Sequence, residues 1–101
     1  MSRTLLHPDT AALELTDVLH ALSDPVRLAI VRTLASGGGC ERRCGAFGLS
    51  VSKSTRTHHF RVLRESGLIE QSSEGTAVVN RLRREDVDAR FPGLLESVLR
   101  P

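Results

Sequence analysis

The sequence predicts a mainly α-helical domain with one small β-hairpin, in the element order α-α-α-α-β-β-α. Three observations predict this fold class. Apolar residues recur at helical spacing along most of the chain, glycine and proline interrupt the helical segments, and after Gly67 the pattern changes to two short β-favouring runs. Because two independent cores would be too small at 101 residues, we expect a single domain over residues 1–101.

The first two predicted helices lie before a glycine run at residues 37–39. The first spans residues 10–22, with apolar side chains every three or four residues. Ser23 or Asp24 can cap the start of the second helix, and Pro25 suits its first turn, where the missing N–H costs nothing. Three consecutive glycines end that helix.

Two further helices, joined by a turn, are expected after the glycines. A short helix over residues 41–47 ends at Gly48. Ser52 is a suitable N-cap for the next helix, which ends at Gly67 because glycine commonly terminates helices. Residues 41–66 therefore form a predicted helix-turn-helix.

Residues 67–82 predict a β-hairpin. The β-favouring runs 68–69 and 77–79 flank a polar segment, 72–76, in which Gly75 is available for a positive φ. An isolated hairpin is marginally stable in water, so helices must pack behind it. Two short helices followed by a two-stranded ribbon are the plan of a winged helix-turn-helix, with the hairpin as the wing.

Both ends of the chain carry apolar stripes. Residues 1–9 are expected to be a flexible N-terminus, and residues 10–22 and 84–100 to be dimerisation helices. The stripes comprise Leu15, Leu19, Leu22, Leu94, Leu95, Val98 and Leu99. A chain of this size has little interior volume, so a homodimer would bury both stripes, although both can also pack inside one monomer.

The composition argues against several classes of protein. No apolar run approaches the roughly 18 residues of a membrane span, and Pro8 interrupts the N-terminus before a signal peptide's apolar region. Two cysteines form at most one disulfide, so we expect a cytoplasmic domain with no membrane partner. The glycines lack phosphate-binding spacing, and Asp86 and Asp88 suit a helix start, so we expect no enzyme and no cofactor.

Basic residues are concentrated in one segment. Residues 42–64 hold six basic residues and no acidic one, whereas the segments on either side each have a net charge of −2. This asymmetry is typical of a nucleic-acid surface, although a solvated basic face or a surface that docks an acidic protein would have the same charge.

One face of the predicted helix over residues 53–65 carries groups that can read bases. Arginine binds guanine O6 and N7, and hydroxyls bind several base acceptors in the major groove. Lys53 and Arg56 lie near the helix start, where they can meet phosphates. The predicted DNA-binding residues are Lys53, Ser54, Arg56, Thr57, His58, Arg61 and Arg64.

Two segments resemble the ArsR/SmtB-type winged-helix repressors. Residues 22–34, LSDPVRLAIVRTL, are similar to the family's L-S-D-P-x-R-L-x-I-L-x-x-L, and residues 54–69, STRTHHFRVLRESGLI, to its S-T-x-S-H-H-L-x-x-L-x-x-A-G-L-V. The resemblance, over about residues 13–82, implies a homodimeric regulator, often a repressor, that binds a double-stranded DNA operator. It places Lys53, Ser54, Thr57 and His58 at the base-reading positions.

The sequence departs from the family's pattern in three places. The turn before the basic helix is one or two residues longer, and Phe60 replaces a leucine, so the core must hold a larger group. The wing tip lacks an arginine that family members often have, and phosphates would repel its Glu74. We therefore expect a weak wing contact, through Thr76 or Arg81.

Cys40 and Cys44 are candidate sensor thiols. At the start of the predicted helix, Arg42, Arg43 and the helix dipole would favour the thiolate of Cys40. Members of the resembled family often sense metals through C-x-C-x-x-C, but C-x-x-x-C supplies at most two of the four ligands of a tetrahedral site. A metal-responsive repressor, a thiol-redox repressor and no sensory role all remain open, and no metal site is expected elsewhere.

Overall fold

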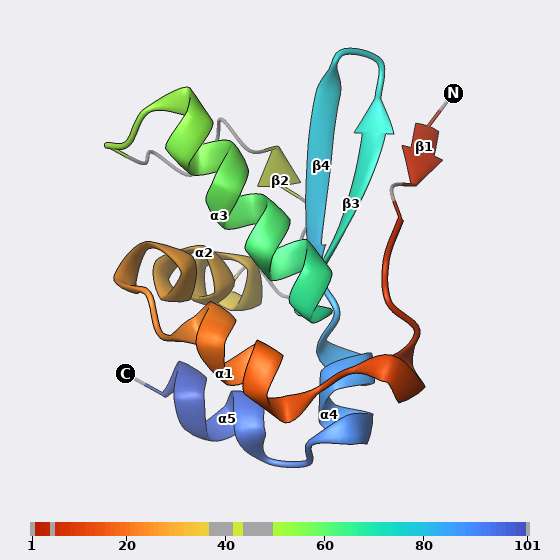
Figure 1. Cartoon of the computed structure of the whole chain (residues 1–101), viewed down its shortest axis with the longest axis vertical. Coiled ribbons are helices and arrows are strands. Elements are labelled where there is room, and N and C mark those ends of the chain that lie inside the picture. The colour runs from red at the N-terminus through yellow and green to blue at the C-terminus, as the bar shows by residue number, and fades with distance from the viewer. Residues whose placement is uncertain (1, 5, 37–41, 44–49, 101) are drawn as a thin grey trace.

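The computed structural model describes residues 2–4, 6–36, 42–43 and 50–100. Figure 1 shows the N- and C-terminal helices at one end of the molecule, with the helix over residues 53–66 and the β-hairpin extending toward the other end. The elements are β1 (Ser2–Thr4), the 3-10 helix η1 (Thr10–Ala12), α1 (Leu15–Leu22), α2 (Pro25–Ser36), β2 (Arg42–Arg43), α3 (Lys53–Ser66), β3 (Ile69–Glu74), β4 (Ala77–Leu82), α4 (Arg84–Arg90) and α5 (Leu94–Leu99). The predicted fold class, mainly helical with an antiparallel hairpin, is confirmed.

The hairpin is built as its sequence predicts, with longer strands than expected. β3 and β4 pair antiparallel from Ile69 opposite Leu82 to Glu74 opposite Ala77. Gly75 takes a positive φ of 65°, which closes the ladder over a two-residue turn. The polar residues at 72–74, expected in the loop, instead continue the ladder of β3, because backbone pairing does not depend on side-chain hydrophobicity.

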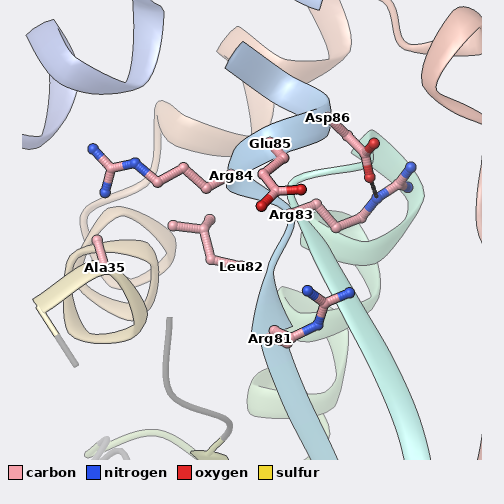
Figure 2. A pocket seen from close by; sticks show the side chains of 7 residues that line it. All are labelled: Ala35, Arg81, Leu82, Arg83, Arg84, Glu85 and Asp86. Carbon is pink, nitrogen blue, oxygen red and sulfur yellow. Dashed lines mark hydrogen bonds and ion pairs between the residues drawn. The ribbon is translucent and has the colours of Figure 1, made fainter. Parts of the chain in front are cut away.

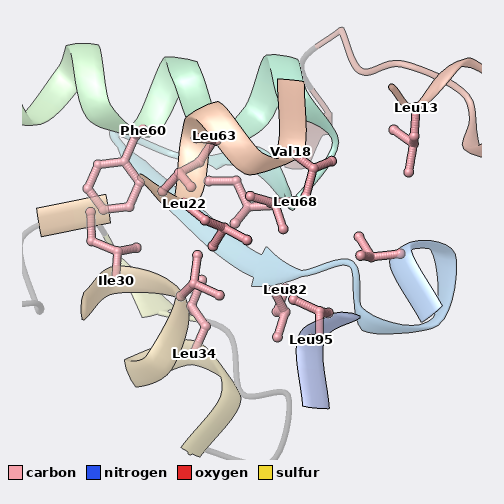
Figure 3. Packing of buried hydrophobic residues seen from close by; sticks show 14 residues of the cluster. Leu13, Val18, Leu22, Ile30, Leu34, Phe60, Leu63, Leu68, Leu82 and Leu95 are labelled. Carbon is pink, nitrogen blue, oxygen red and sulfur yellow. The ribbon is translucent and has the colours of Figure 1, made fainter. Parts of the chain in front are cut away.

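A single hydrophobic core lies between the helices and the base of the hairpin. Phe60, the larger residue on α3, is 2% exposed and fits this core beside Ile30 of α2 and Leu63 of α3 (Figure 3). The core residues are Leu13, Val18, Ala21, Leu22, Ile30, Val31, Leu34, Phe60, Leu63, Leu68, Ile69, Leu82, Val87 and Leu95. Packing on α1, α2 and the hairpin thus fixes the inner face of α3 and leaves its outer face free.

The helix predicted over residues 10–22 is interrupted in the structure. It consists of η1 and α1, with Leu13 between them in an extended conformation (φ −67°, ψ 129°). Leu13 is 1% exposed and packs so closely on Gly67, at the end of α3, that a Cβ there would collide with it. Its carbonyl accepts a hydrogen bond from Arg90 Nε at 3.2 Å. Tertiary packing therefore draws Leu13 out of the helical stripe.

Residues 1–9 were expected to be flexible, but the described part of this segment, residues 2–4 and 6–9, is placed by contacts with the rest of the fold. β1 pairs antiparallel with β3. The backbone N–H of Gln71 donates to His7 Nε2 at 2.8 Å, and Arg83 Nη1 donates to the carbonyl of Pro8 at 2.8 Å. The outer edge of a hairpin has free backbone donors and acceptors, and local sequence patterns do not show which segment will pair with them.

The helix predicted over residues 41–47 is wrong at Arg42 and Arg43. These residues form β2, which pairs antiparallel with β4 opposite Asn80 and Val79. Within the described residues the sheet order is β1-β3-β4-β2, so both edges of the hairpin are paired. The rest of the predicted helix, together with Cys40 and Cys44, lies outside the described residues.

The C-terminal segment 84–100 forms two short helices, as its sequence suggests. α4 ends before Phe91, and Gly93, with a φ of 83°, reverses the chain into α5. Val87 and Leu95 are fully buried and anchor one helix each to the core.

Of the two residues predicted to cap the start of the second helix, Ser23 and Asp24, the structure shows that Asp24 caps α2. Its Oδ2 accepts hydrogen bonds from the backbone N–H groups of Val26 at 2.9 Å and Arg27 at 3.0 Å. The Arg27 N–H is the largest cause that holds the pKa of Asp24 below its ordinary value, because these bonds favour the charged carboxylate.

Replacing Asp24 with alanine should lower the free energy of unfolding by about 1 kcal/mol at pH 7, the usual contribution of an N-cap. Because the folded-state pKa is lowered, this stabilisation is present above the ordinary aspartate pKa of about 4 and is lost as the pH falls through the folded-state value. Urea denaturation at pH 7 and pH 3 checks this. Asp9→Ala is the control, because Asp9 makes no side-chain cap bond; an equal loss in both variants would contradict the assignment.

Candidate nucleic-acid interface

α3 has the boundaries that its flanking residues predict. Ser52 Oγ accepts a hydrogen bond from the backbone N–H of Thr55 at 3.2 Å, and Gly67, with a φ of 89°, closes the C-terminus. The inner side of the helix buries His59, Phe60, Leu63 and Ser66.

Five of the predicted DNA-binding residues come together on the outer side of α3. They line one open hollow of about 470 Å³, and all of them are exposed. We call this surface the recognition face, and it comprises Lys53, Ser54, Thr57, His58 and Arg61. The structure gives the side chains of Lys53 and Arg61 no hydrogen bond or ion pair with any described residue, so both cations are available to an external anion or base.

The smaller polar groups of the recognition face are held at the start of α3. Thr57 Oγ1 donates to the carbonyl of Lys53 at 2.9 Å, which leaves its acceptor lone pairs unused in this contact. Ser54 Oγ lies 3.3 Å from Ser52 Oγ. The first turn of α3 therefore combines hydroxyl groups, free backbone N–H groups and a lysine, which together suit a phosphate backbone and adjacent base edges.

Arg56 and Arg64, also predicted to bind DNA, lie outside the hollow. Arg56 is half-buried, and its side chain makes no hydrogen bond with the described residues. Arg64 turns toward the sheet, where its Nη1 donates to Gln71 Oε1 at 3.0 Å, and Gln71 Nε2 donates to Asn80 Oδ1 at 2.8 Å. The long side chain of Arg64 thus reaches the neighbouring strand and does not join the other five residues, and its contact with DNA stays a prediction.

His59, the neighbour of His58 in the sequence, lies in the interior. It is 8% exposed, and its Nδ1 lies 3.2 Å from Nη1 of the buried Arg27 on α2. Sequence reasoning did not single out Arg27. Its position did indicate burial, because helical spacing places Arg27 on the same apolar face of α2 as Ile30, Val31 and Leu34. A cation on a buried face needs hydrogen-bond partners there.

The wing offers few free cations. Arg81 Nη2 is paired with Glu70 Oε2 at 3.2 Å, and both side chains are exposed. Arg81 also lines a separate hollow of about 310 Å³ beside the start of α4 (Figure 2). Thr76 is exposed in the turn of the hairpin. The expectation of a weak wing contact stays a prediction, with Arg81 partly neutralised by its neighbour.

Asp86, interpreted from sequence as a complement to the helix dipole, also joins the N-terminal segment to α4. Its Oδ1 accepts from Thr10 Oγ1 at 2.8 Å, and its Oδ2 from Arg83 Nε at 3.0 Å (Figure 2). The Thr10 hydroxyl is the largest cause that lowers the pKa of Asp86. These contacts give Asp86 a structural role.

Within the described part of the chain, no three histidine, cysteine or acidic side chains are grouped closely enough to hold a metal ion. This does not bear on Cys40 and Cys44, whose redox or metal sensing stays a prediction. Among the same residues, no helix is both long and apolar enough to cross a bilayer.

Comparison with known proteins identifies the family. The family described as "Helix-turn-helix domain" matches residues 22–72, about half of the chain. The helix-turn-helix-type transcriptional regulator YceK of Bacillus subtilis (strain 168), itself uncharacterised, is 37% identical over 83 residues, which cover 80% of this chain and 82% of that protein. The chain belongs to the helix-turn-helix transcriptional regulators.

Solved structures place the regulator's fold among the ArsR-type winged-helix proteins. An ArsR family transcriptional regulator superposes with a TM-score of 0.68 at 20% identity, covering 91% of this chain and 92% of the other. The transcriptional repressor BigR from Xylella fastidiosa superposes with a TM-score of 0.62 at 26% identity, covering 86% and 87%. The resemblance carried by residues 22–34 and 54–69 is therefore confirmed, and with it the prediction of a DNA-binding transcriptional regulator.

Proposed function

We propose that the regulator binds a specific double-stranded DNA operator as a homodimer in the cytoplasm and represses transcription. The observation that carries this proposal is the recognition face, where five side chains with base-reading or phosphate-binding chemistry line one hollow. BigR, which shares the fold, is itself a transcriptional repressor, and this supports the direction of regulation.

The recognition face suits a major groove. An α-helix fits the width of that groove, and Arg61, in the third turn of α3, has a planar guanidinium that can bind guanine O6 and N7 together. Ser54, Thr57 and His58 can bond further base edges, while Lys53 approaches phosphates with the positive N-terminal end of α3. The side of α3 opposite this face is buried, so only one orientation toward DNA is available.

The apolar surface of α1 and α5 supports a homodimer. Leu15 and Leu19 on α1 are 44% and 45% exposed, although they are among the larger apolar residues of the chain. Leu94, Val98 and Leu99 are only partly buried against the core. α5 lies at the end of the molecule away from the hairpin tip (Figure 1). Pairing there about a two-fold axis would place two α3 helices about 34 Å apart, one turn of DNA, for a pseudo-palindromic operator.

A mobility-shift assay tests the proposal. The probes are a duplex from the region upstream of the regulator's own gene and a scrambled duplex of equal length and composition. The proposal predicts that the upstream duplex is bound at least a hundredfold more tightly, in a complex that contains two protomers. Equal affinity for both duplexes, or no binding to either, would contradict it.

Two arginine substitutions distinguish base reading from phosphate binding. Arg61→Ala should cost about 1–3 kcal/mol of binding free energy on the upstream duplex and relax its base preference. Arg56→Ala should weaken binding to both duplexes by the same factor, because a phosphate contact carries no sequence information. Titrations of each variant against both duplexes measure the difference. Unchanged affinity of Arg61→Ala for the upstream duplex would show that α3 is not the reading helix.

A further inference from the structure

A buried guanidinium connects the end of α1 to the inner side of α3. Arg27 is 7% exposed. Its Nε donates to the carbonyl of Ala21 at 2.8 Å, and its Nη2 donates to the carbonyl of His20 at 3.3 Å. Both carbonyls belong to the last turn of α1, and the His20 carbonyl also accepts from the backbone N–H and the hydroxyl of Ser23, at 3.1 and 2.6 Å. The third nitrogen, Nη1, lies 3.2 Å from His59 Nδ1 on α3.

The direction of the contact between Arg27 and His59 follows from its chemistry. A guanidinium has only donors, so Nδ1 of His59 must be the acceptor, and the ring proton of the neutral imidazole lies on Nε2. Asp24 Oδ2 lies 3.9 Å from the same Nδ1. Arg27 therefore holds one ring nitrogen of His59 in place, and it is itself held by two carbonyls of another helix.

His59 is adjacent in sequence to His58 of the recognition face. Consecutive residues on a helix are separated by about 100° of rotation, so a side chain fixed on the inner side sets the angle at which the outer side is presented. A rotation of α3 by one sixth of a turn would move its outer side chains by several ångströms, which is enough to break base contacts that need hydrogen-bond geometry.

We propose that Arg27 and His59 are positioning residues for DNA recognition, which fix the rotation of α3 relative to the end of α1. This inference rests on the proposed function of the recognition face. Because α1 also carries Leu15 and Leu19 of the proposed dimer surface, the same contact links the helix that pairs the two copies to the helix that reads DNA.

The test uses two substitutions of His59 and a matched control. His59→Asn keeps an acceptor oxygen near the position of Nδ1, whereas His59→Leu fills similar space without an acceptor. Ser66→Ala is the control for stability, because Ser66 is buried on the same helix and bonds only its own turn and Leu68. For each full-length variant, circular dichroism measures the folded fraction, and titration measures the ratio of affinities for the upstream and scrambled duplexes.

His59→Leu should lower this affinity ratio about tenfold while the affinity for the scrambled duplex changes less than twofold. His59→Asn should keep the ratio within about threefold of the wild type. Ser66→Ala should leave the ratio unchanged even if its melting temperature falls. A ratio that is lowered equally by the leucine and asparagine variants, or by neither, would overturn the positioning role.

Residual dipolar couplings of the DNA-free protein separate this inference from the proposed function. They report the angle by which α3 is rotated about its own axis relative to α1, which should change in His59→Leu and stay as in the wild type in His59→Asn. If wild-type protein shows no preference for the upstream duplex, the proposed function fails, and the helix angle still decides the positioning role. An angle unchanged in His59→Leu would contradict that role whatever DNA is bound.

Discussion

Replacing Leu19 with glutamate should convert the dimer to a monomer and lower affinity for the upstream duplex at least a hundredfold. In the proposed dimer, Leu19 is covered by the partner copy, and burying an unpaired carboxylate there costs far more than the interface gains from a single leucine. A monomer presents one α3 helix and loses the second half-site. Light scattering measures the change in mass, from twice 11.0 kDa for the proposed dimer to 11.0 kDa for the monomer.

The matched control for this substitution is Ala29→Glu. Ala29 is exposed on α2, outside both apolar stripes, so the same charge is added without entering the proposed interface. Ala29→Glu should keep the mass of the dimer. A wild-type mass near 11.0 kDa at micromolar concentration, or a dimer that survives Leu19→Glu, would contradict pairing through α1.

Raising the salt concentration from 50 to 200 mM should weaken binding to the upstream duplex about a thousandfold. We expect the operator-bound dimer to neutralise roughly six phosphates. Lys53 and Arg56, whose side chains have no partner among the described residues, supply two of these contacts from each protomer. Affinity then falls with the logarithm of salt at a slope of about −5. Titrations at four salt concentrations measure this slope.

Two variants show which cations contribute to the salt dependence. Lys53→Ala should reduce the slope by about 2, because each protomer loses one phosphate contact. Arg81→Ala should leave the slope unchanged, because Arg81 is paired with Glu70 on the hairpin. A slope that depends on Arg81 and not on Lys53 would place the wing, rather than α3, at the centre of the DNA contact.

The elements that could be predicted from sequence are those with local signals. α3 begins after Ser52 and ends at Gly67, and both caps act within a few residues of the chain. The cap by Asp24 and the positive φ of Gly75 are equally local. Because the same helical spacing that predicts α3 also sets its outer face, five of the seven residues predicted to bind DNA meet in one hollow.

The features that could not be predicted depend on partners far away in the chain. β1 and β2 exist because the hairpin has two free edges, and nothing within either short segment indicates that pairing. Leu13 leaves its helix to pack on Gly67. Arg64 reaches Gln71 because β3 lies beside the end of α3. The contact between Arg27 and His59 joins residues 32 positions apart.

The central claim is that the outer side of α3 enters the DNA groove, and amide hydrogen exchange with and without the upstream duplex tests it most directly. The regulator should gain protection at the first turns of α3, around Lys53 to Arg61, with no comparable change in α4. Protection confined to α4 and α5, with exchange in α3 unaltered by the duplex, would contradict the claim.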